Sequence, residues 1–191
     1  MGTSISHASP RTANWRAVGA IYESEMIPAD RASQELWRAA TNQPAGNLGA
    51  DLGHPVVATC AQIVRDIPSR ADAIARVRQT LAMSGVASLA TDIAQRAAVS
   101  CFAAPGDRVG AFVQSLVGEA TNYLVSRDLP GHVGRSNRIA TVSDAMSFKA
   151  QVLDHARQMA QSVLRPPGVE ASPSSWKSYI TTVVGRLEGR E

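Results

Sequence analysis

The residues best suited to acid–base chemistry at a phosphate lie between Arg127 and His132. An arginine guanidinium can stabilise negative charge that develops on a phosphate, and a histidine can transfer a proton near neutral pH. The chain spaces these two residues as Arg-x4-His, with Asp128 directly after the arginine. Because Pro130 and Gly131 lie between them, the two residues cannot share one regular helix.

The Arg-x4-His spacing resembles that of the HEPN ribonucleases, which are α-helical and have a polar residue after the arginine. The resemblance implies an RNase or toxin in which Arg127 stabilises phosphate charge and His132 moves a proton. The alternative is that Arg127 closes a helix at the negative end of its dipole. Arg135 and Arg138 extend this stretch into a basic loop over residues 127–140. That loop is either a docking surface for an acidic partner or RNA backbone, or a solvated loop.

A second reactive group is the amine exposed when methionine aminopeptidase removes Met1, which the tiny Gly2 permits. An α-amine has a pKa of about 7.7–8.0, against about 10.4 for a lysine, so part of it is unprotonated at neutral pH. Lys149 and Lys177 are the only lysines. The glycine amine is therefore the best nucleophile of the chain towards an activated acyl group. Met-Gly-x-x-x-Ser, completed by Ser6, also fits N-myristoylation, which requires a eukaryotic transferase.

Other groups in the sequence favour structural roles over catalysis. Cys60 and Cys101 lie on apolar helix faces, which predicts reduced, buried thiols. The side chains of Asp154 and His155 diverge by about 100° on a helix, so they cannot act together. Glu119 lies just outside the apolar stripe of its helix, where a solvated or ion-paired glutamate is common. No cysteine–histidine set has metal-ligand spacing, and we expect neither a metal nor a cofactor.

The composition indicates a globular bacterial protein in the cytoplasm. The chain is 45% hydrophobic and 18% charged, with Ala and Arg prominent. No apolar run reaches the roughly 18 residues that span a bilayer, and no secretion signal is present, so we expect no membrane contact. The net charge of +3 is too small to argue for nucleic-acid binding.

The elements that must position these groups are helices. Residues 107–126 form the clearest one, with apolar residues at the i, i+3, i+4, i+7 spacing and Asp107 as its N-cap. Similar stripes elsewhere predict an all-α bundle of seven or eight helices. We expect N-caps at Asp30, Ser69 and Ser175, a loop over residues 42–53, and Met146 among the buried residues. The Thr141-x-x-Asp144 stretch predicts a capping box.

The same patterns divide the chain into four parts. Residues 1–13 are a flexible N-terminal arm, residues 14–165 a helical core domain, residues 166–175 a Pro/Ser/Gly linker, and residues 176–191 an amphipathic helix. The last helix packs on its own bundle or on another chain. In the second case the protein is an oligomerising scaffold, and a homo-oligomer is the simplest form.

The start of the chain, Met1-Gly2-Thr3-Ser4 followed by a Ser/Pro-containing arm and a helical body, resembles the QatB proteins of bacterial Qat anti-phage operons. That family accompanies a QueC-like enzyme, a KAP-type P-loop ATPase and a TatD-like nuclease. The resemblance implies a non-enzymatic component whose Gly2 amine receives a 7-deazaguanine group from the QueC-like enzyme. Thr3 and Ser4 would be the contacts by which that enzyme recognises the arm.

Overall fold

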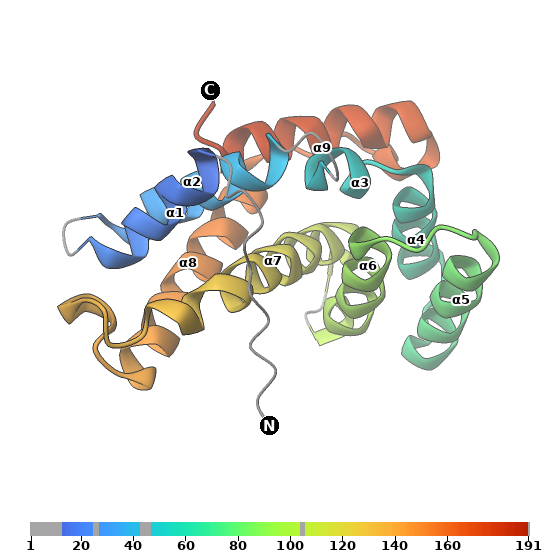
Figure 1. Cartoon of the computed structure of the whole chain (residues 1–191). Helices are drawn as coiled ribbons and strands as arrows, with labels where there is room; N and C mark the ends of the chain where they lie inside the picture. Colours follow the sequence, from blue (N-terminus) through green and yellow to red (C-terminus); the bar gives the residue numbers. More distant parts are fainter. Residues whose placement is uncertain (1–12, 25–26, 43–46, 104–105, 191) are drawn as a thin grey trace.

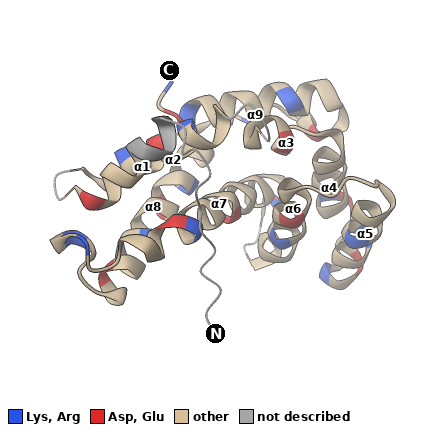
Figure 2. Cartoon of the chain, viewed as in Figure 1, with Lys and Arg blue, Asp and Glu red and all other residues tan. Residues whose placement is uncertain are grey.

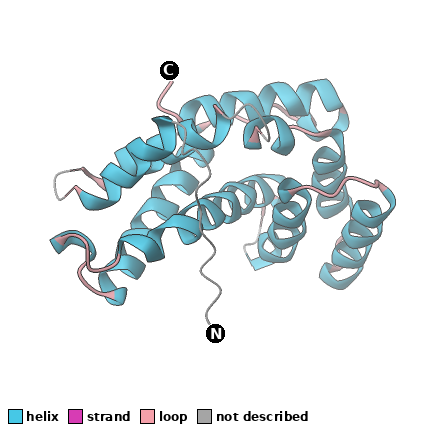
Figure 3. Cartoon of the chain, viewed as in Figure 1, coloured by secondary structure: helices cyan, strands magenta, loops and turns pink. Residues whose placement is uncertain are grey.

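The computed structural model describes residues 13–24, 27–42, 47–103 and 106–190, within which all regular structure is helical (Figures 1 and 3). The all-α prediction is confirmed. The described residues contain nine α-helices: α1 (Ala13–Glu23), α2 (Ala29–Thr41), α3 (Leu48–Leu52), α4 (Pro55–Asp66), α5 (Arg70–Met83), α6 (Leu89–Ser100), α7 (Arg108–Asp128), α8 (Val142–Ser162) and α9 (Pro173–Leu187). None of these helices is long and apolar enough to cross a membrane. Gly2, Thr3 and Ser4 of the expected arm lie outside the described residues.

Helix α7 is the centre of the bundle, as its apolar stripe predicts. The Asp107 carboxylate accepts the Gly110 amide at 3.0 Å and so caps the helix. Helices α2, α4, α6 and α8 all pack against α7 (Figure 1). The side chains of the stripe are buried at positions Val109, Phe112, Val113, Leu116, Val117, Ala120 and Leu124. Helix α7 has more buried residues than the other helices of the described chain, and burial of each large side chain contributes about 1.5–3 kcal/mol.

Helix α8 lies along α7 and runs in the opposite direction. The predicted capping box is present, because Thr141 accepts the Asp144 amide at 3.1 Å while Asp144 accepts the Thr141 amide. The Lys149 amine donates to the Ser126 hydroxyl at 2.8 Å. The prediction for Met146 was wrong: its side chain is 59% exposed. Phe148 is buried instead. Because Met146 lies two residues before Phe148, its side chain points about 200° away around the helix and therefore faces outward.

The C-terminal helix α9 packs on its own bundle. Trp176 is fully buried, donates its indole N–H to the Leu52 carbonyl at 3.0 Å, and lies with its ring centroid 6.4 Å from that of Phe112. The helix begins at Pro173 after Ser172, not at Ser175, because proline is favoured in a first turn. The apolar stripe that an oligomerising scaffold would use is therefore covered within the chain.

Residues 166–175, expected as a linker, are attached to the core. They contain the short 3₁₀ turn η4 (Val169–Ala171), whose Val169 and Glu170 side chains are buried. Gly168 precedes the turn with a left-handed φ of 62°, which glycine adopts without strain. The Gln62 side chain of α4 donates to the Glu170 carbonyl at 2.8 Å. The segment therefore connects α8 to α9 along a fixed path.

Two local predictions near the N-terminal half were also wrong. Residues 42–53 were expected as a loop, but α3 forms there because Asn47 caps it and Leu48 and Leu52 are buried one turn apart. Tertiary packing outweighs the low helix propensity of glycine in this segment. Asp30 does not cap α2, which begins one residue earlier after Pro28, and its carboxylate accepts the Arg31 amide instead.

Candidate functional site

The Arg-x4-His residues lie where α7 gives way to the 3₁₀ turn η2 (Leu129–His132). Arg127 is in the last turn of α7, and its guanidinium donates twice to the Asp128 carboxylate, at 3.1 and 2.8 Å. His132 is buried, and its Nδ1 lies 3.1 Å from a Glu23 carboxylate oxygen of α1. The structure therefore brings both residues to one end of the bundle but binds each to a different carboxylate.

Tyr22 packs against His132 and lies near the Arg127–Asp128 ion pair. Its ring centroid is 5.0 Å from that of His132 and 6.0 Å from that of Phe148. Burial raises the pKa of the Tyr22 hydroxyl, the nearby Asp128 raises it further, and Arg127 opposes both. The aromatic contacts hold the histidine ring against α1, so this cluster joins α1 to the end of α7.

The basic stretch over residues 127–140 is attached to the fold at Arg138, while Arg127 and Arg135 stay exposed. Arg138 donates to the carbonyls of Ser24 and Ile27, and its guanidinium lies 4.5 Å from the centroid of the Phe148 ring. Burial lowers the pKa of Arg138. Arg135 lies 3.8 Å from the Glu23 carboxylate. The Arg138 contacts attach the stretch to the residues that flank the α1–α2 connection, and Arg135 adds an exposed ion pair to α1.

Positive and negative side chains are mixed along the helices rather than gathered on one element (Figure 2). No group of three or more His, Cys, Asp or Glu side chains within the described part of the chain could hold a metal ion. The predicted free, buried thiols are confirmed. Burial raises the pKa of Cys60 to about 12 and that of Cys101 to about 11, so neither is a thiolate nucleophile at neutral pH.

A different site, not foreseen from the sequence, lies at the other end of the α7–α8 pair. A groove of about 670 Å³ runs between the first turns of α7 and the last turn of α8, and Tyr179 of α9 lines it. Its volume falls in the range of small-ligand sites. Polar groups line it from several elements: Asp107, Gln114, Gln161, Arg165 and Tyr179.

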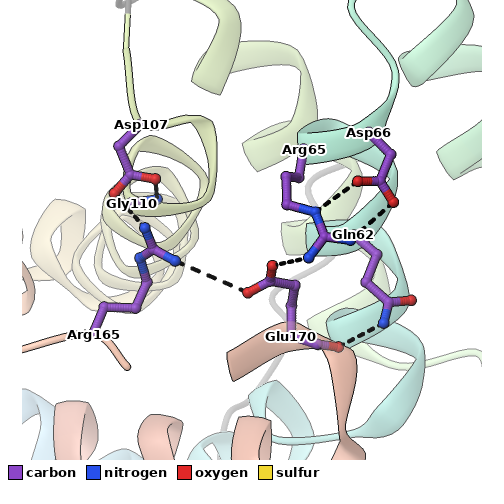
Figure 4. Close-up of polar contacts among 7 residues, drawn as sticks. All are labelled: Gln62, Arg65, Asp66, Asp107, Gly110, Arg165 and Glu170. Carbon is purple, nitrogen blue, oxygen red and sulfur yellow. Dashed lines mark hydrogen bonds and ion pairs between the residues drawn. The ribbon is translucent and has the colours of Figure 1, made fainter. Parts of the chain in front are cut away.

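Arg165 lines this groove, and Figure 4 shows its ion pairs with Asp107 and Glu170. Its guanidinium lies 2.8 Å from Asp107 and 3.9 Å from the buried Glu170 carboxylate. Glu170 also binds Arg65 of α4, which is paired in turn with Asp66 at 2.6 Å. The chain of alternating charges ties α4, η4 and the first turn of α7 together, and so holds one wall of the groove in place.

Asp107 and Tyr179, which both line the groove, have shifted pKa values. Burial opposes ionisation of Asp107, but the Gly110 amide and Arg165 together hold its pKa below the usual value. Burial raises the pKa of Tyr179, while Arg165 lowers it and Asp107 raises it. The site therefore presents an ionised carboxylate beside a neutral phenol, a combination that can both accept and donate hydrogen bonds.

Sequence reasoning found Asp107 as a helix cap but missed Arg165, Glu170 and Tyr179. The available signal was the pair of opposite charges on either side of Pro166-Pro167-Gly168, within a stretch whose composition is that of a linker. No family model, curated protein or solved structure matches the chain.

Proposed function

We propose that this chain is a non-enzymatic component of a bacterial anti-phage defence system in which a QueC-like enzyme joins a 7-deazaguanine group to the amine of Gly2. A KAP-type P-loop ATPase and a TatD-like nuclease would complete the system. The observation that carries the proposal is the Met1-Gly2-Thr3-Ser4 start and its similarity to the QatB proteins. In this proposal the helical body holds the partners and Gly2 is the acceptor.

Amine chemistry supports Gly2 as the acceptor. The chain offers only three primary amines after removal of Met1: the α-amine, Lys149 and Lys177. Lys149 is held by the Ser126 hydroxyl, and Lys177 lies exposed on the surface of α9. An α-amine has a lower ordinary pKa than a side-chain amine, so part of it is a free base at neutral pH. Attack by that amine on an adenylated carboxylate forms an amide bond and expels AMP.

The arrangement of the chain is compatible with a tag delivered away from the body. Ala13, the first described residue, lies eleven residues after Gly2. A chain of that length spans at most roughly 40 Å when fully extended. Arg127 and His132 are the two residues of the alternative ribonuclease site. Within the described body, Arg127 binds the Asp128 carboxylate and His132 lies against the Glu23 carboxylate. This use of the polar groups favours a scaffold role for the body.

The test is the intact mass of the chain after co-expression with the QueC-like enzyme and its neighbours. Replacing Lys149 and Lys177 by arginine leaves the α-amine as the only primary amine and preserves the charge. We expect loss of Met1 and one added group in this double variant, and no added group when Gly2 is replaced by Val. An added mass that disappears with the lysines assigns the modification to a side chain and contradicts the proposal. A chain that stays unmodified under these conditions also contradicts it.

A further inference from the structure

Tyr179 brings a hydroxyl to the wall of the groove beside α7 and α8. The Tyr179 side chain is only 6% exposed and lines the groove beside α7 and α8. Its ring packs against Trp176, with the centroids 6.3 Å apart, which fixes the direction of the hydroxyl. Within the part of the chain that the structure describes, the hydroxyl forms no hydrogen bond. The hydroxyl oxygen is not sealed from solvent, so it is available at the wall of the groove to hydrogen-bond a ligand.

The charges around the groove disfavour a ligand with a net charge. Arg165 is flanked by Asp107 and Glu170, and Arg65 and Asp66 continue the alternation behind them. An anion would meet the two carboxylates beside Arg165, and a cation would meet the guanidinium. A neutral group that carries a hydrogen-bond acceptor and a donor is compatible with the carboxylates and with the guanidinium. An amide is the simplest such group.

The remaining lining fits a peptide better than a small amide. Gln114 on α7 and Gln161 on α8 add two carboxamides, each able to donate and accept. An extended peptide presents carbonyl and N–H groups in alternation along its length, so it can use several such groups in turn. Val163 and Leu164 give the groove an apolar edge, and Leu164 is 91% exposed. An apolar side chain of the bound segment would cover it.

We propose that this groove binds an uncharged, extended peptide segment of a partner protein that carries one apolar side chain. Tyr179 and Arg165 donate hydrogen bonds to a backbone carbonyl of the segment. Asp107 accepts a backbone N–H, and the apolar side chain lies against Leu164. The site belongs to the helical body, so it is independent of the proposed modification of Gly2.

The experiment uses the full ¹⁵N-labelled chain and the capped peptide acetyl-Ala-Leu-Ala-amide as the probe. We expect saturable amide shifts at Gly110, Gln114 and Gln161 with a dissociation constant near or below about 10 mM. Tyr179→Phe removes only the unpaired hydroxyl, so affinity should fall about two- to tenfold while the melting temperature stays the same or rises. Tyr123→Phe is the control, because Tyr123 is an exposed tyrosine of α7 that does not line the groove.

Four results would overturn the inference. Absence of saturable shifts removes the site, and equal peptide affinity in Tyr179→Phe removes the role of the hydroxyl. Larger groove shifts with inorganic phosphate than with the peptide identify an anion site. Equal shifts with acetamide at the same concentration identify a small amide ligand. Each result is read on the unmodified chain, so none depends on whether Gly2 receives a tag.

Discussion

Replacement of Glu170 by Gln should destabilise the fold more than any comparable change of a surface carboxylate. The Glu170 side chain is 1% exposed and lies between the guanidinium groups of Arg65 and Arg165 (Figure 4). The amide keeps the size of the side chain but removes its charge and turns one acceptor atom into a donor that faces an arginine. The change therefore isolates the electrostatic contribution from packing.

The size of the effect depends on the ion pairs that Arg65 and Arg165 retain after the substitution. Breaking a fully buried ion pair costs about 3–5 kcal/mol because the remaining charge is left unpaired. Here Arg65 retains Asp66, Arg165 retains Asp107, and the Arg65 side chain is 41% exposed, so water and other carboxylates compensate in part. We expect a loss of about 1–3 kcal/mol in the free energy of unfolding, near the cost of an unsatisfied buried group. In a chain of this size that corresponds to about 2–4 °C in melting temperature per kcal/mol.

Urea unfolding followed by tryptophan fluorescence measures this loss, since Trp37 and Trp176 are both fully buried. The matched control is Asp154→Asn, which changes an exposed carboxylate of α8 that hydrogen-bonds only the neighbouring Gln158. The control should shift stability by less than about 0.5 kcal/mol. A Glu170→Gln loss no larger than that of the control would refute the view that this carboxylate holds α4, η4 and α7 together.

The remaining predictions concern the other end of the bundle, acid stability and the thiols. His132→Ala removes the Glu23 and Tyr22 contacts, so it should lower the melting temperature; RNA cleavage that is lost in this variant without loss of stability would instead support the ribonuclease hypothesis. Asp107 has a lowered pKa in the fold, so its contribution is complete above its unfolded pKa of about 3.9 and is lost as the pH falls through the lower folded value. The urea midpoint measured from pH 6 to pH 3 should therefore fall less steeply at its acid end in Asp107→Asn than in the unchanged chain. Cys60 and Cys101 should react with a thiol reagent only on unfolding, at a rate that rises with urea, and fast labelling in native buffer would contradict their burial.

Local patterns were enough to predict most of the helices, because each depends on residues within one or two turns. The caps at Asp107, Ser69 and Thr141 and the stripe of α7 are of this kind. Helix α3 could not be predicted in this way. Its five residues contain a glycine and are too few to be stable alone, and the helix exists because Leu48 and Leu52 are buried by the rest of the fold.

The groove was missed for a related reason. Its residues come from the start of α7, the end of α8 and the middle of α9, and no spacing in the sequence links them. Proline, glycine and serine over residues 166–175 favour a flexible linker. Glu170 within that segment nevertheless pairs with Arg65, which lies 105 residues earlier in the sequence, as well as with the nearby Arg165. Composition reports the local preference of the backbone, and it carries no information on distant ion partners.

The covered face of α9 limits the surfaces through which this body could bind another protein. Trp176, Ile180 and Leu187 are buried within the chain, so an association through this stripe would first have to open the core. The groove offers a route that requires no opening, since the Tyr179 hydroxyl lies at its wall and Leu164 at its edge is exposed. If a partner were to bind through α9 instead, substitution of Trp176 by Ala would abolish folding and binding together, whereas Tyr179→Phe would leave both intact. If the groove is the binding site, Tyr179→Phe should weaken binding in a chain that is otherwise as stable as before, and that separation is what distinguishes the two routes.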